Sequence, residues 1–156
     1  LKAEEIKDPI GKQYKDKITS INGITAFVIA EGSSGPVYIN QKDIREFQLA
    51  KGAIAAGIEV LLKEYGAETK DIDEVFLAGA FGNYLRPESA CDVGLIPKEL
   101  KDRIKGIGNA AGAGAKLALI SQKEYERAVA LSREIKYIEL SAHPDFNSIF
   151  LNKVGF

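Results

Sequence analysis

The chain has 156 residues, of which 46% are hydrophobic and 28% charged, and its formal net charge is −1. This balance argues against a nucleic-acid partner or an anionic membrane surface, because both favour a strongly basic face. The single cysteine cannot form an internal disulfide, and no apolar run reaches the roughly 20 residues of a membrane span, so we predict a cytoplasmic protein.

The start of the chain has little regular pattern. The sequence contains no methionine and begins with leucine, so we expect a fragment of a longer protein. Residues 1–20 are charged and broken by Pro9 and Gly11, which is typical of a linker or edge segment. Two β-rich stretches follow, Gly23–Ala30 and Val37–Asn40, and the turn residues between them predict a hairpin.

The clearest helix is predicted over Asp43–Tyr65. Apolar residues recur there at alternating steps of three and four, on one face. The stripe consists of Ile44, Phe47, Ile54, Ile58, Leu61 and Tyr65. Lys51 falls within this stripe, so we expect its ammonium group to point inward or to snorkel out. Gly66 is a natural stop for the helix.

Strands and helices alternate in the second half of the chain. The predicted elements are, in order, a strand at Glu74–Ala78, a short helix from Pro87, a strand at Arg103–Gly108, a helix at Asn109–Ser121, a helix capped by Ser121 and ending near Glu134, a last strand at Ile135–Leu140, and a closing helix in the tail. This alternation predicts an α/β fold with a mixed sheet and helices packed on it.

Two of these strands run into glycines. The stretch "VFLAGAFGNYLRP" (Val75–Pro87) is one junction, and "IKGIGNAAGAGA" (Ile104–Ala115) is the other. On neighbouring parallel strands both junctions would meet at one sheet edge, where α/β proteins bind ligands. Glycines there could admit a nucleotide, or they could serve only close packing. Neither the P-loop pattern nor the dinucleotide fingerprint occurs.

Four segments carry a resemblance to a known family. They are "YINQKDIREFQLAKGAIAAGIEVLL", "DEVFLAGAFGNYLRPESACDVGLIP", "GNAAGAGAKLAL" and "IKYIELSAHPDFNSIF". Together they resemble the C-terminal ATPase region of reductive activators of corrinoid proteins, in the acetate and sugar kinase/Hsp70/actin superfamily. The resemblance covers roughly Val37 to Phe156. It implies that residues 21–156 form a ribonuclease-H-like lobe, the second lobe of an actin-like ATPase domain.

The resemblance also implies cofactors and partners. Full-length members use ATP with Mg²⁺ to return the Co(II) corrinoid of a corrinoid (iron–sulfur) protein to Co(I). Their [2Fe-2S] cluster lies in an N-terminal ferredoxin domain, which this sequence lacks together with the first lobe. The Asp-x-Gly-Thr phosphate loop of the superfamily is absent as well. We therefore expect this chain alone to have no ATPase activity. Whether the protein forms a homodimer stays open.

The same resemblance assigns candidate binding residues. The first junction resembles the adenosine motif, the helix with Gln48 and Lys51 resembles the Hsp70 helix that touches adenosine, and the second junction resembles the connecting motif of the interlobe hinge. The candidates are Gly79, Ala80, Phe81, Gly82, Asn83, Gln48, Lys51, Arg86, Gly108 and Asn109. No catalytic residue and no metal ligand is predicted within this chain.

Two alternatives stay open. One is a lobe of a small-molecule kinase of the same superfamily, and the other is a non-catalytic interaction module in which the glycines only pack. The sole histidine, His143, is predicted to lie in the turn before the closing helix. Cys91 is predicted to be a buried structural thiol.

Overall fold

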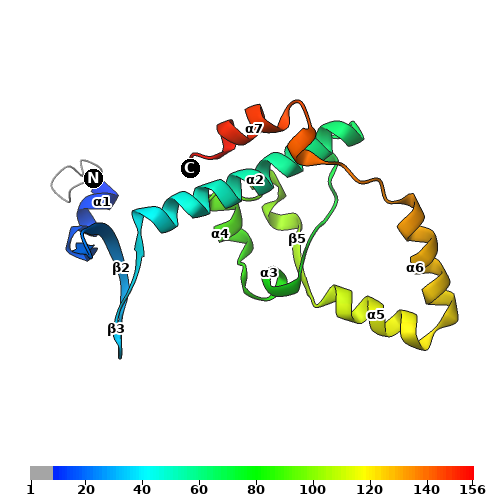
Figure 1. The fold of residues 1–156 in the computed structure, drawn as a ribbon, viewed down its shortest axis with the longest axis horizontal. Coiled ribbons are helices and arrows are strands. Elements are labelled where there is room, and N and C mark those ends of the chain that lie inside the picture. Colours follow the sequence, from blue (N-terminus) through cyan, green and yellow to red (C-terminus); the bar gives the residue numbers. More distant parts are fainter. Residues whose placement is uncertain (1–8) are drawn as a thin grey trace. The chain divides into compact units, whose positions relative to one another are not determined.

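The computed structural model describes residues 9–156, apart from the side chains of Pro9, Ile10 and Phe81 (Figure 1). The chain divides into two compact units, Leu1–Ala50 and Lys51–Phe156. Within the described residues, the model contains no helix with both the length and the apolar character needed to cross a membrane.

The first unit contains a three-stranded antiparallel sheet in the order β1-β2-β3. Its elements are α1 (Pro9–Gln13), the 3₁₀ helix η2 (Lys15–Lys17), β1 (Ile18–Ile21), β2 (Ile24–Gly32) and β3 (Gly35–Asn40). The predicted hairpin is confirmed as β2 and β3. Its turn is tighter than predicted, because Gly32 pairs directly with Gly35.

Strand β1 lies where the sequence indicated a linker or edge segment. The first eight residues of that segment lie outside the described part. Asn22 and Gly23 connect β1 to β2 with φ of 52° and 77°, and Ile21 pairs with Ile24 on either side of them. Positive φ at both central residues defines a type I′ hairpin turn, which favours Asn-Gly. This dipeptide was therefore an available signal for β1.

Helix α2 (Gln41–Tyr65) begins two residues before its predicted start. The Asn40 side chain accepts hydrogen bonds from the N–H groups of Lys42 and Asp43 at 2.8 and 3.1 Å. The Asp43 carboxylate in turn accepts from the N–H of Asn40 at 2.9 Å. This reciprocal pair acts as a capping box. The predicted stop is confirmed, because Gly66 has a φ of 68°.

The second unit contains a parallel two-stranded sheet of β4 (Val75–Ala78) and β5 (Ile104–Gly108). The other elements of this part are η3 (Thr69–Asp71), α3 (Gly79–Tyr84), α4 (Pro87–Asp92), η4 (Lys98–Arg103), α5 (Ala110–Ile120) and α6 (Gln122–Glu134). The predicted strands and the helix from Pro87 are confirmed. Helix α3 occupies the first glycine junction, where no helix was predicted.

Two apolar clusters stabilise this unit. The first consists of Ala90, Cys91, Ile96 and Leu100, and side chains of β4 and β5 pack against it. The second joins α2 to the closing helix α7 (Phe146–Lys153) through Ala56, Val60 and Ile149. Figure 1 shows α7 running beside α2. The predicted closing helix is confirmed.

The predicted strand at Ile135–Leu140 is wrong. These residues have no partner strand in the described chain, and Leu140 begins a 3₁₀ helix, η5 (Leu140–Ala142). The Glu139 carboxylate accepts a hydrogen bond from the N–H of Ser141, which turns the chain there. Alternating hydrophobicity predicts an extended backbone, but a strand also needs a neighbour to pair with.

Candidate functional site

The two glycine junctions lie at the same edge of the β4–β5 sheet. The strands are parallel, and Ala78 is paired with Gly108. Gly79 and Gly108 follow with φ of 67° and 57°, in the left-handed region that favours glycine. The predicted juxtaposition of the two junctions is therefore confirmed.

Asparagine side chains connect and cap the two junctions. The Asn83 amide oxygen lies 3.5 Å from the point that a Cβ on Gly108 would occupy, so α3 reaches the second junction. The Asn109 side chain accepts a hydrogen bond from the N–H of Gly112 at 2.9 Å and caps α5. The first turn of α5 presents its remaining N–H groups at this edge.

Two glycines at this edge allow backbone to pack on backbone. A Cβ on Gly82 would lie 2.1 Å from the Leu77 carbonyl oxygen, and one on Gly106 would lie 2.5 Å from the Gly82 carbonyl oxygen. Close packing, the alternative reading of the sequence, thus accounts for both glycines. A contact between Gly82 and a nucleotide stays a prediction.

Gly79 differs from Gly82 in its surroundings. Apart from its own chain neighbours and helix backbone, no atom of the described residues lies within 4 Å of the position of a Cβ on Gly79. Gly79, Ala80, Asn83 and Arg86 are all exposed, and Arg86 immediately precedes α4. The exposed backbone at Gly79 is the part of the first junction that a ligand could approach without displacing the protein's own atoms.

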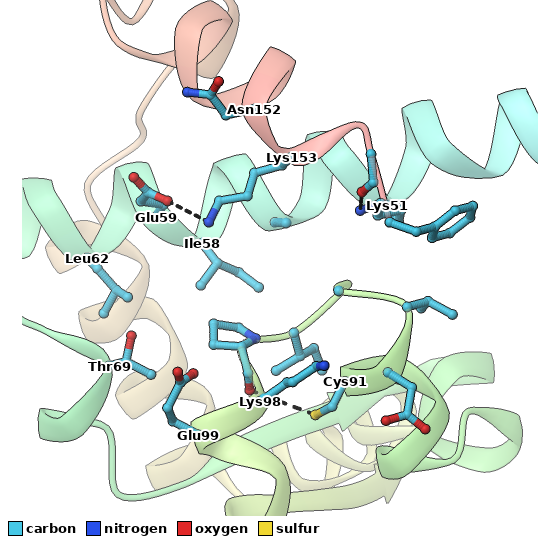
Figure 2. Close-up of a pocket in the computed structure, with 18 residues that line it drawn as sticks. Lys51, Ile58, Glu59, Leu62, Thr69, Cys91, Lys98, Glu99, Asn152 and Lys153 are labelled. Atoms are coloured by element: carbon cyan, nitrogen blue, oxygen red, sulfur yellow. Dashed lines mark hydrogen bonds and ion pairs between the residues drawn. The ribbon is translucent and has the colours of Figure 1, made fainter. Parts of the chain in front are cut away.

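Lys51 lines a different site, a cavity of about 540 Å³ (Figure 2). Lys51 is only 3% exposed, and its ammonium group donates a hydrogen bond to the carbonyl oxygen of Gly155. The same nitrogen lies 5.3 Å from the centre of the Phe156 ring. Burial, followed by repulsion from Lys153, lowers the pKa of Lys51. Of the two orientations left open by the sequence, inward or snorkelling out, the structure has the inward one.

The cavity is walled by α2, the loop after α4 and residues 152–156. Its ionisable side chains other than Lys51 include Glu59, Asp92, Lys98, Glu99 and Lys153. Glu59 and Lys153 pair at 3.0 Å. Opposite charges thus balance around the cavity, and among the described side chains it is lined by none of Gly79, Ala80, Gly82, Asn83, Gly108 and Asn109. The structure does not bring Lys51 to the glycine junctions within this cavity.

Gln48 lies in the first unit. It lines a cavity of about 400 Å³ with side chains of the antiparallel sheet, among them Phe27 and Ile39. Lys51, three residues further along α2, belongs to the second unit. The two predicted helix contacts therefore line separate cavities.

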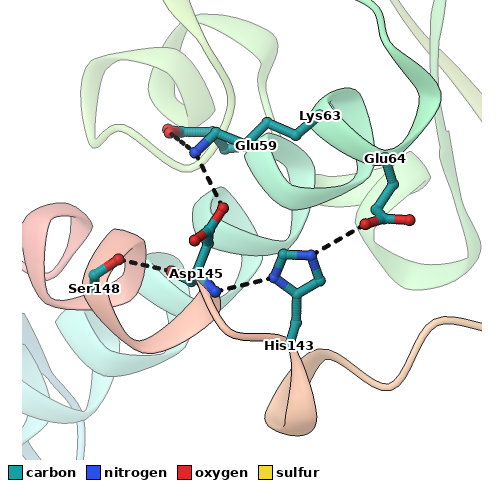
Figure 3. Close-up of polar contacts among 6 residues, drawn as sticks. All are labelled: Glu59, Lys63, Glu64, His143, Asp145 and Ser148. Atoms are coloured by element: carbon teal, nitrogen blue, oxygen red, sulfur yellow. Dashed lines mark hydrogen bonds and ion pairs between the residues drawn. The ribbon is translucent and has the colours of Figure 1, made fainter.

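Cys91 and His143 have structural surroundings. Cys91 is 1% exposed, and burial raises the pKa of its thiol. The His143 Nδ1 atom accepts a hydrogen bond from the N–H of Asp145 at 3.2 Å, which leaves the proton of the neutral ring on Nε2 (Figure 3). Nε2 lies 3.3 Å from the Glu64 carboxylate and donates to it. These contacts hold the turn before α7 against α2.

Over residues 9–156, no three His, Cys, Asp or Glu side chains gather in an arrangement that could hold a metal ion. The sequence has one cysteine, so this chain does not supply the thiolates that an iron–sulfur cluster needs.

Comparisons with known proteins cover nearly the whole chain. Residues 3–156 match a family described as the C-terminal domain of RACo, the ASKHA domain. Corrinoid activation enzyme RamQ of Eubacterium limosum is 39% identical over 133 residues, which are 85% of this chain and 22% of that protein. The [Co(II) methylated amine-specific corrinoid protein] reductase of Methanosarcina barkeri is 26% identical over 97% of this chain and 31% of its own length.

A solved structure shows the same fold. The reductive activator for corrinoid, iron–sulfur protein superposes with a TM-score of 0.82 at 29% identity, over 99% of this chain and 25% of that one. The chain thus spans between 22% and 31% of the length of these relatives.

Proposed function

We propose that this chain, which belongs to the family of C-terminal ASKHA domains of RACo, is the ATP-binding lobe of a longer reductive activator. That protein would return a corrinoid protein from the Co(II) to the Co(I) state at the expense of ATP. The names of both relatives support a corrinoid protein as the partner, because one is a corrinoid activation enzyme and the other a Co(II) corrinoid protein reductase.

The observation that carries the proposal is the shared edge of the two junctions. Gly79 is exposed, and Gly108 ends the neighbouring parallel strand. Adenosine would lie against the backbone at Gly79, where no Cβ intervenes. Asn83 lies beside Gly108 and can donate or accept hydrogen bonds at the same edge.

The remaining parts of the site belong to the rest of the longer protein. ATP with Mg²⁺ would supply the driving force for the uphill electron transfer, and a [2Fe-2S] centre in the rest of the longer protein would supply the electron. Residues of this lobe bind and orient the nucleotide and need provide no acid or base. Closure of two lobes on ATP would then shift a conformational equilibrium that changes the fit to the corrinoid partner.

The test compares two matched glycines in the full-length protein. Gly79 and Gly66 have φ of 67° and 68°, and for both, the described residues beyond the local backbone place no atom within 4 Å of the Cβ position. Alanine at either position should cost about 1 kcal/mol of stability, because both backbones are left-handed. Only Gly79→Ala should also weaken ATP binding, by about tenfold or 1.4 kcal/mol, measured by calorimetric titration. Equal ATP affinity of the two variants would refute the site.

The whole activity has a separate readout. Full-length protein supplied with ATP and reductant should convert Co(II) to Co(I) in a corrinoid protein, followed by its visible spectrum. Phosphate transfer to a sugar or an acid, without corrinoid reduction, would favour the kinase alternative.

This chain alone should bind ATP weakly and hydrolyse none. With the adenosine side only, the affinity should fall from the micromolar range, about −8 kcal/mol, toward the millimolar range, about −4 kcal/mol. Magnesium-dependent turnover by the purified chain would contradict this expectation.

A further inference from the structure

The cavity that Lys51 lines contains a buried charge without a counter-ion. Among the side chains that the structure describes, Lys51 is the only charged one that is buried. Its ammonium group has three N–H donors, and its hydrogen bond to the carbonyl oxygen of Gly155 uses one of them. Within the described residues no carboxylate pairs with it, and the neighbouring charge that acts on it is a second cation, Lys153. Burial of an uncompensated charge is costly, so Lys51 favours an anion in the cavity.

The other charged side chains of the lining are paired or exposed. All the charges of the lining sum to zero, but they differ in burial. Glu59 and Lys153 neutralise each other at 3.0 Å. The remaining members are exposed, and they are Asp92, Lys98 and Glu99. A ligand with one negative charge therefore matches the single buried positive charge, whereas a multiply charged anion would also be repelled by the acids of the lining.

The walls of the cavity indicate what the rest of the ligand is like. Apolar side chains come from α2 and from the loop after α4, and they are Ala55, Ile58, Leu62, Val93, Ile96 and Pro97. Thr69 and Asn152 add neutral hydrogen-bonding groups (Figure 2). A volume of about 540 Å³ is that of a small-molecule site, in which apolar walls hold the body of a ligand and a few polar groups orient it. Every residue of the lining belongs to the second unit, Lys51–Phe156.

We propose that this cavity binds a small organic acid that has one carboxylate and an apolar body. The carboxylate accepts charge-assisted hydrogen bonds from the remaining N–H donors of Lys51. The apolar body lies against α2 and the loop after α4, where Ile58 and Ile96 line the cavity. The proposal goes beyond ATP binding and does not depend on it, because the nucleotide is assigned to Gly79 and the glycine edge.

The test titrates the full-length protein with para-fluorobenzoate, followed by fluorine NMR. The neutral counterpart, para-fluorobenzamide, has nearly the same shape and no charge. The acid should bind about tenfold more tightly than the amide, because only the acid compensates the charge of Lys51. Lys51→Met should abolish this preference. The matched control is Lys63→Met on the same helix, because Lys63 is not part of the lining and its side chain is 52% exposed, and this variant should keep the preference.

The other possible results of this titration each overturn the proposal. Equal affinities for the acid and the amide, or an unchanged preference in Lys51→Met, would refute a carboxylate site at this lysine. Competitive displacement of para-fluorobenzoate by inorganic phosphate or by ATP would assign the cavity to a multiply charged anion. The comparison of Gly79→Ala with Gly66→Ala tests the nucleotide site separately, so failure of one site is distinguishable from failure of the other.

A photoaffinity measurement on the unmodified full-length protein covers the case in which Lys51→Met does not fold. The probe para-benzoylbenzoate has a single carboxylate and an apolar body. Irradiation should attach it to the lining of the cavity, on α2 between Ala55 and Leu62 or in the loop between Val93 and Pro97, as identified by mass spectrometry. Excess para-fluorobenzoate should reduce this labelling several-fold, and para-fluorobenzamide should reduce it far less. Labelling confined to other parts of the protein would refute the site.

Discussion

The glycine edge of β4 and β5 and the contact between α2 and α7 are both tightly packed, but they are held by different groups. At the glycine edge, backbone meets backbone because Gly82 and Gly106 have no Cβ. Between α2 and α7, the side chain of Lys51 reaches the carbonyl oxygen of Gly155. The contact at the glycine edge contains no side chain that could move to relieve a clash. The contact between α2 and α7 contains the long, flexible side chain of Lys51.

The α2–α7 contact also uses a small residue. A Cβ on Gly52 would lie 3.2 Å from the Cα of Val154, which is close but above the distance found at Gly82. The stacked rings of Phe146 and Phe150, 6.1 Å apart, lie on the other helix. Both glycines face backbone atoms, and they differ in distance: a Cβ on Gly82 has no room, whereas a Cβ on Gly52 would need Val154 to shift by a few tenths of an ångström.

The largest effect is expected from Gly82→Ala. The added Cβ would lie 2.1 Å from a backbone oxygen, so the substitution should cost about 3 kcal/mol or more of the free energy of unfolding. Urea denaturation measures the loss. Gly114→Ala is the control, because no atom lies within 4 Å of that Cβ position, and it should stabilise α5 by about 0.5–1 kcal/mol. Equal effects of the two substitutions would remove the distinction between packing glycines and open ones.

An intermediate effect is expected from Lys51→Met. Methionine keeps an apolar stem but loses the hydrogen bond to Gly155, and we expect a loss of about 1–2 kcal/mol. Hydrogen exchange near the end of the chain should accelerate as well. Lys153→Met removes only the ion pair to Glu59, whose side chains are 43% and 38% exposed, and should cost less than about 1 kcal/mol.

The pH dependence of stability should identify Lys51. Its folded pKa is lowered from 10.5, so the unfolded chain binds the proton more strongly than the folded one. Stability from this group therefore rises as pH increases from the lowered pKa to about 10.5. Lys51→Met should lose this rise. The raised pKa of Cys91 acts in the opposite direction above 9.0 and cancels when the two proteins are compared. Parallel pH curves for both proteins would contradict a desolvated Lys51.

The smallest effect is expected from His143→Gln. The histidine ring, which is 12% exposed, bridges Asp145 and the 37% exposed Glu64, and Lys63 lies 3.7 Å from the Asp145 carboxylate (Figure 3). Loss of the ring should cost at most about 1 kcal/mol, and Glu64→Gln should cost less. If His143→Gln lowered the free energy of unfolding as much as Lys51→Met does, this network would be the main contact that holds α7 against α2.

Much of the local structure could be predicted because its signals are local. The periodicity of α2, the Gly66 stop and the Ser121 cap each depend on residues a few positions apart, and each is present. The strand predicted at Ile135–Leu140 failed because its pattern says nothing about a pairing partner. Strand β1 was missed although Asn22-Gly23 indicated a hairpin turn.

The amino-acid sequence alone determined helix α2 with its Gly66 stop, the two glycine junctions and the place of Lys51 in an apolar stripe, since hydrophobic spacing and turn chemistry act over a few residues. Only the tertiary structure decided that Gly82 packs while Gly79 stays open, and that Lys51 is held by Gly155, 104 positions away. These contacts join atoms that lie far apart along the chain, and their distances depend on how the elements pack, which no short stretch of sequence encodes.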